Sequence, residues 1–135
     1  MSTIYNDIRG ALETTLSNVA NVPTVYYENQ RTPTNPGVEF IKCIMIPGIR
    51  RPAVRGTNPQ QYIQGMFEMR IHTDEGEGPG TAQTYASRLI SAFEATTDIT
   101  FNNKILRIRE VEQGAGTQDS PWYILPVRAY WYIYN

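Results

Sequence analysis

The sequence has 135 residues, the length of one domain, and is long enough to bury a continuous hydrophobic core. Twelve Lys and Arg residues against thirteen Asp and Glu residues give a net charge of −1, which excludes the basic excess typical of nucleic-acid binders. A single cysteine, Cys43, excludes an internal disulfide and a cysteine-based zinc site.

Neither a signal-peptide pattern nor an apolar run of membrane-spanning length is visible, so we expect a protein made in the cytosol. From residue 3 to about residue 19 the apolar residues recur at helical spacing, on a stripe formed by Ile4, Ile8, Leu12, Leu16 and Val19. Asn21 and Pro23 end this predicted helix. The β-branched and aromatic run at 24–28 and the apolar run at 38–46 predict two strands, separated by a proline-rich loop.

The segment 47–60 contains three prolines and two glycines between two predicted strands. Connections of this length inside a compact domain are usually functional or disordered. We interpret it as an arm or a long hairpin tip that leaves the body of the domain and contacts a partner protein. The residues proposed for that contact are Ile49, Arg50, Arg51, Val54 and Arg55. A solvated charged loop and a contact with phosphate of passing DNA are the alternatives.

Residues 61–73 alternate between apolar and polar side chains, as in a strand with one buried face. An acidic glycine-rich bend follows, and residues 81–95 then show the spacing of an amphipathic helix. Residues 96–103 and 114–120 predict turns, and 104–113 predicts a strand with a bulge near Glu110.

The last strand is predicted at 121–134, where Pro126 indicates a local edge or a bend. One face of this strand carries Tyr130, Tyr132 and Tyr134, which we consider candidates for a subunit interface, with ordinary edge decoration as the alternative. The predicted fold is therefore α+β, a two-layer sandwich of order αβββαββ. A mainly antiparallel sheet of about five strands carries both helices on one face, in a single domain 1–135 with a loop protruding at 47–60.

Few residues suggest chemistry. Asp74, Glu75 and Glu77 form an acidic turn that is a weak candidate for Mg²⁺ or Ca²⁺; a solvated turn near a helix N-terminus, where negative charge is favourable, is the simpler explanation. His72 has no accompanying nucleophile motif, and Cys43 lies in an apolar run typical of a buried thiol. We therefore predict no catalytic residue, no metal and no cofactor.

Two blocks of the sequence resemble a known family. GMFEMRIHTDEGEGPGTAQTYASRLISAF is similar to its pattern of a Gly-x-Phe strand, a Gly-x-Gly bend and a helix, and PWYILPVRAYW is similar to its closing strand. The matching positions are Gly65, Phe67, Met69, Gly76, Gly78, Ala82, Ala86, Leu89, Phe93, Trp122, Tyr123, Pro126, Val127 and Trp131. The family is that of the tail terminators, or tail completion proteins, of long-tailed bacteriophages.

The resemblance implies a structural virion protein and no enzyme. It implies a homo-oligomer, a ring of six copies on the head-proximal end of the tail tube, which stops tube growth and provides the surface for head-tail joining. The implied partners are the tail tube protein and a head completion or connector protein, with genome DNA passing through the bore without sequence-specific binding. Another connector, a tail tube subunit, or a small metal-dependent enzyme or ligand-binding domain are the alternatives.

Overall fold

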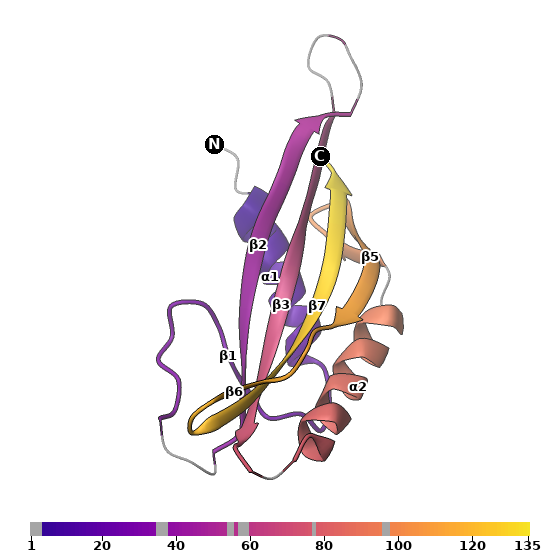
Figure 1. The fold of residues 1–135 in the computed structure, drawn as a ribbon. Coiled ribbons are helices and arrows are strands. Elements are labelled where there is room, and N and C mark those ends of the chain that lie inside the picture. The colour runs from indigo at the N-terminus through magenta and orange to yellow at the C-terminus, as the bar shows by residue number, and fades with distance from the viewer. Residues whose placement is uncertain (1–3, 35–37, 54–55, 57–59, 77, 96–97) are drawn as a thin grey trace.

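The computed structural model describes residues 4–34, 38–53, 56, 60–76, 78–95 and 98–135 (Figure 1). These residues form two helices and seven strands. The elements in chain order are α1 (Ile4–Ser17), β1 (Thr24–Tyr26), β2 (Phe40–Pro52), β3 (Gln61–Asp74), α2 (Gly80–Ala95), β4 (Asp98–Phe101), β5 (Lys104–Gln113), β6 (Thr117–Asp119) and β7 (Trp122–Tyr134). Neither described helix is long and apolar enough to cross a membrane.

All strands belong to one sheet in the order β1-β2-β3-β7-β5-β4, with β6 paired to the beginning of β7. β1 and β2 run parallel and every other described pair is antiparallel. The α+β class predicted from the sequence is confirmed. The predicted strand count is wrong, because the sheet is mixed and has seven strands instead of about five.

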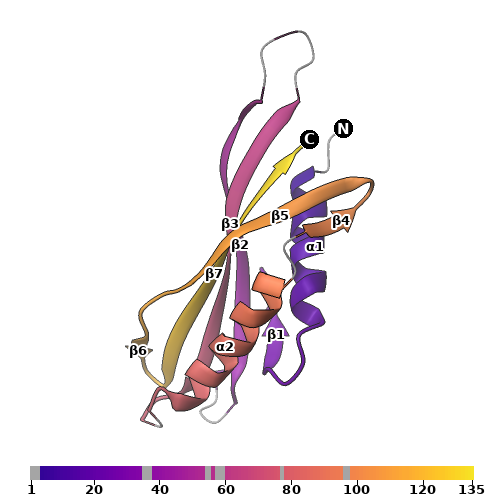
Figure 2. The same cartoon turned by 90° about the vertical axis from the view of Figure 1, so that its right-hand side faces the viewer.

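Both helices pack on the same face of the sheet, and their apolar stripes meet its inward side chains in one core (Figure 2). The alternation predicted for 61–73 is visible here, because Ile63, Phe67, Met69 and Ile71 are all buried. Ala82, Ala86, Leu89 and Phe93 of α2 and the stripe Ile4, Ile8, Leu12 and Leu16 of α1 complete the layer. The opposite face of the sheet is covered by neither described helix; we call it the open face.

The predicted loop at 47–60 is largely part of a hairpin. β2 continues to Pro52, where it pairs with Gln61 at the start of β3, after a register shift between Pro47 and Arg50. A Cβ added to Gly48 at this shift would lie 2.9 Å from the carbonyl oxygen of Gln64, so the shift requires a residue without a side chain. We call residues 46–53 and 60–66 the β2–β3 arm, which lies at the upper end of the sheet in Figure 1. Val54 and Arg55 lie outside the described residues.

The C-terminal half agrees with several local predictions. Asn102 and Asn103 have φ angles of 46° and 60°, the left-handed conformation of a tight hairpin turn between β4 and β5. The bulge expected near Glu110 is present as a register shift between Ile108 and Glu110.

β7 lies inside the sheet, with β3 on one side and β5 and β6 on the other. Pairing with β5 ends at Val127 and pairing with β6 begins at Ile124, so Pro126 lies in the gap between them. The edge expected at Pro126 is therefore local, because only this short stretch of β7 lacks a partner strand on one side.

Candidate functional site

The open face carries the side chains with functional potential, because strand alternation directs every second residue away from the helices. In β3 and β7 the register pairs Glu68 with Arg128 and His72 with Ile124 on this face. Three groups follow one another along the strands: an aromatic group around His72, a charged group around Glu68 and a tyrosine group around Tyr62.

The charged group is built around Glu68, which is 5% exposed. Arg70 donates from Nε to one of its carboxylate oxygens at 2.6 Å, and Arg128 donates from Nε to the other at 2.9 Å. Glu112 extends the group, accepting a 2.6 Å hydrogen bond from the Tyr130 hydroxyl. The hydrogen bond to Glu68 raises the pKa of Arg128, and the hydrogen bond to Glu112 raises the pKa of Tyr130. Arg128 and Tyr130 are therefore each held in the protonated form by a carboxylate partner, as suits a fixed surface network.

In the aromatic group the His72 ring stacks on Phe40 with 4.1 Å between ring centroids. Trp122 meets the Phe40 ring edge-on at 5.2 Å. Burial lowers the pKa of His72, whose Nδ1 lies 3.1 Å from the carbonyl oxygen of Arg70. A histidine that stacks on an aromatic ring and contacts a backbone carbonyl acts as a packing element, and these contacts explain the position of His72.

The tyrosine group is formed by Tyr62, Tyr132 and Tyr134, with Arg51 above the Tyr62 ring at 5.1 Å. Tyr62 lies 5.4 Å from Tyr134 between ring centroids. The row predicted from the sequence is thus divided, because Tyr130 turns to Glu112 while Tyr132 and Tyr134 join Tyr62. Tyr62 was missed as a member, since only strand register brings it beside β7.

The two described arginines of the predicted partner loop point to opposite faces of the sheet. Arg51 pairs with Tyr62 on the open face, whereas Arg50 reaches the helix side and lies 5.8 Å from the ring of Tyr5 in α1. Ile49, between them and the body of the sheet, is 52% exposed. The structure thus places Ile49, Arg50 and Arg51 on β2 itself, and not on a loop.

The acidic turn is tied to the end of the sheet. The Ser120 hydroxyl donates to the Glu75 carboxylate, whose oxygens lie 2.8 and 2.9 Å away, and the Glu75 amide donates to the carbonyl oxygen of Pro121. Asp74 ends β3 opposite Trp122, and Glu77 lies outside the described residues. Across the described part of the chain, no three His, Cys, Asp or Glu side chains cluster as a metal site would require.

Cys43 is buried on β2, and burial raises the pKa of its thiol to about 12, with Glu13 and Glu28 nearby adding to the effect. A thiol with this pKa carries almost no thiolate near neutral pH. The apolar run therefore encloses an unreactive side chain, as the sequence pattern indicates.

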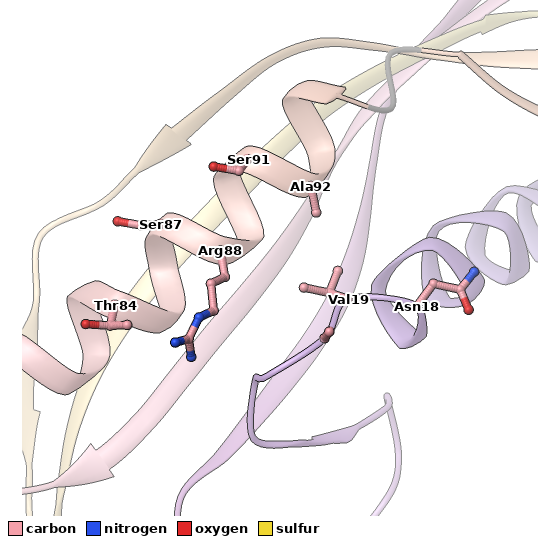
Figure 3. A pocket seen from close by; sticks show the side chains of 8 residues that line it. Asn18, Val19, Thr84, Ser87, Arg88, Ser91 and Ala92 are labelled. Atoms are coloured by element: carbon pink, nitrogen blue, oxygen red, sulfur yellow. The ribbon is translucent and has the colours of Figure 1, made fainter.

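A groove of about 630 Å³ separates the end of α1 from α2 (Figure 3). Its lining comprises Asn18, Val19, Ala20, Thr84, Ser87, Arg88, Ser91 and Ala92. Arg88 spans the groove and donates to the carbonyl oxygen of Asn21 at 2.5 Å. The lining offers hydroxyl groups without a histidine or carboxylate to activate them, so it lacks the parts of a nucleophilic site.

Comparison with known proteins agrees with this geometry. The model of a family described as phage tail terminator protein matches residues 7–131. A protein of known structure with 20% sequence identity gives a TM-score of 0.76 over 99% of this chain and 97% of its own, a likeness that concerns the fold alone. No curated protein sequence matches significantly.

Proposed function

Because the chain belongs to the phage tail terminator family, we propose that it acts as a single domain that assembles into a ring of six copies on the tail tube. The ring caps the head-proximal end of the tube, stops its polymerisation and offers the surface to which the filled head binds. Its place is the head-tail junction of the virion, after assembly in the host cytoplasm. Its direct partners are the tail tube protein and a head completion or connector protein.

The open face is the single observation that best supports this role beyond family membership. It presents tyrosines and paired charges over three long neighbouring strands, and neither described helix covers it. Tyrosine-rich surfaces with a polar surround are typical of protein interfaces. We assign this surface to contacts inside the virion, with genome DNA passing the ring without sequence-specific contacts.

The experiment is imaging of particles assembled without this protein. Overlong tubes and unattached heads are expected, and supplying the purified protein during assembly should restore both normal tube length and joining. Tubes of normal length joined to heads would contradict the proposal. A tail tube subunit, the alternative role, would instead leave no tubes at all when it is removed.

A further inference from the structure

β2 lies at one side of the sheet, and only its beginning has a partner strand on that side. β1 pairs with Phe40–Lys42, and no other strand lies beside this edge of β2 within the described part of the chain. A strand edge of this kind presents backbone amides and carbonyls with which a strand of another copy can pair. Such pairing has no fixed end point, so a protein that assembles in a defined number of copies must block it.

The amide of Met45 on this edge already has a partner from the same chain. It donates to Oε1 of Glu28 at 2.8 Å. Glu28 follows the last residue of β1 by two positions. If β1 continued in its parallel register with β2, the carbonyl of residue 28 would accept this bond. The Glu28 carboxylate therefore takes the place of a strand backbone and satisfies the Met45 amide.

The next position on the same edge has no amide hydrogen. Every second residue of a strand directs its amide to the same side, so residue 47 follows residue 45 here. Residue 47 is Pro47, which lacks an N–H group. The register shift between Pro47 and Arg50 comes directly after it and interrupts the regular spacing that a pairing strand needs. Glu28 thus engages the one amide that lies on this edge between β1 and the shift.

The turn that carries Glu28 is also bound to β2 by a second side chain. Lys42 donates from Nζ to the carbonyl oxygen of Tyr27 at 2.7 Å and to that of Gln30 at 2.9 Å. Within the turn, the Tyr27 amide donates to Oε1 of Gln30 at 2.9 Å, and Asn29 has a φ angle of 64°. One side chain from each segment therefore holds the turn against the edge of β2.

We propose that Glu28 and Lys42 form a latch that prevents β2 from pairing with a strand of a second copy. The latch consists of the Glu28 carboxylate on the Met45 amide and the Lys42 ammonium on the two turn carbonyls. The contact is autoinhibitory, because it occupies the amide that an added strand would need. Association between copies is thereby directed to side-chain surfaces such as the open face. This inference goes beyond the proposed ring and does not depend on it.

Amide hydrogen exchange at Met45 tests the latch. In the unsubstituted protein this amide should exchange far more slowly than a solvated amide. Glu28→Ala should speed its exchange by about tenfold to a hundredfold, because a hydrogen bond to a charged acceptor is lost. Glu28→Gln should stay close to the unsubstituted protein, since its side-chain oxygen can accept the same bond. Glu110→Ala is the matched control, because that exposed carboxylate contacts Arg109 at 3.4 Å and no backbone amide.

Sedimentation velocity and infrared spectroscopy at increasing protein concentration test the consequence for assembly. Glu28→Ala should form species larger than those of the unsubstituted protein and show the infrared band of intermolecular β-sheet. Glu28→Gln and Glu110→Ala should do neither. Lys42→Met should act in the same direction as Glu28→Ala, because it frees the turn while keeping an apolar stem. If Glu28→Ala fails to fold, Lys42→Met and the exchange rate of the native Met45 amide still decide.

A Met45 amide that exchanges freely in the unsubstituted protein would overturn the latch. Faster exchange in Glu28→Ala or Lys42→Met without larger species would overturn its role in blocking strand addition. Neither result alters the proposed function, which imaging of particles tests separately.

Discussion

Gly65 lies on β3 directly opposite Trp131 of β7. A Cβ at this position would lie 2.4 Å from Cζ2 of Trp131 and 2.6 Å from the carbonyl oxygen of Ile46. The indole ring thus occupies the space that any other residue would need. Glycine is needed at this position because a neighbouring side chain approaches closely, and not because of an unusual backbone conformation.

Gly65→Ala should therefore lower the free energy of unfolding by about 2 kcal/mol, because a packed ring and a backbone carbonyl must both move. Gly10→Ala is the matched control, since nothing lies within 4 Å of its added Cβ in the middle of α1. The free energy of unfolding of that variant should rise by about 0.5 to 1 kcal/mol, because alanine favours a helix more than glycine does. Urea unfolding of the two variants measures both values, and equal stabilities would contradict the packing argument.

His72 is the only histidine in the chain, so stability in its titration range reports mainly on this residue. Burial lowers its folded-state pKa below the ordinary value of 6.5, and the unfolded chain then binds more protons in the interval between the two. The contribution of His72 to the free energy of unfolding should be fully present above the ordinary value of 6.5. It should be lost as the pH falls through the folded-state pKa. Thermal unfolding between about pH 7.5 and pH 5.5 should show this slope.

The variant His72→Gln should flatten that pH dependence while lowering stability at high pH, because the stack on Phe40 is lost. An unchanged slope in the variant would show that other groups produce it.

At the scale of elements, the ion pairs of the charged group link three neighbouring strands on the open face. Glu68 on β3 binds Arg128 on β7, which also lies 3.4 Å from Glu112 on β5. A carboxylate that is almost fully buried needs both of its arginine partners to compensate for lost hydration.

Glu68→Ala should cost about 2 kcal/mol of unfolding free energy, since it removes two charge-assisted hydrogen bonds and leaves Arg128 partly buried. Glu110→Ala is the control, because its 3.4 Å contact with Arg109 is between exposed side chains. That change should stay within about 0.5 kcal/mol. Chemical denaturation of both variants measures the two losses of unfolding free energy. Similar losses would contradict the argument that burial makes Glu68 important.

Two short strands could not be predicted from sequence patterns. Two strands, Asp98–Phe101 and Thr117–Asp119, fall in segments that the sequence predicts as turns. Each has four residues or fewer, so even the alternation of Asp98–Phe101 is too short to predict a strand; pairing with β5 and β7 makes them strands. The long strands and both helices were predictable because each repeats its apolar pattern over several turns or residue pairs.

At the scale of the whole molecule, helices cover one face of the sheet, and the other face is open and carries tyrosines and paired charges. A protein arranged in this way should be stabilised by its own assembly, because binding shifts the unfolding equilibrium toward the folded state. The melting temperature should therefore rise by several degrees over about a hundredfold increase in protein concentration.

Ile49→Asp should remove this concentration dependence without changing the melting temperature of the dilute protein, since Ile49 is largely exposed. Differential scanning calorimetry at a series of concentrations makes the comparison. A melting temperature independent of concentration in the unsubstituted protein would argue against self-assembly.

By itself the sequence determined the α+β class, the two helices, the long strands, the bulge in β5 and the family, because local spacing and short motifs encode these features. Only the tertiary structure decided which residues share a surface. Arg50 and Arg51 are neighbours in the chain and face opposite sides, whereas Tyr62 and Tyr134 are far apart and in contact. The physical reason is strand register, which is fixed by the packing of the whole core and by no stretch of sequence alone.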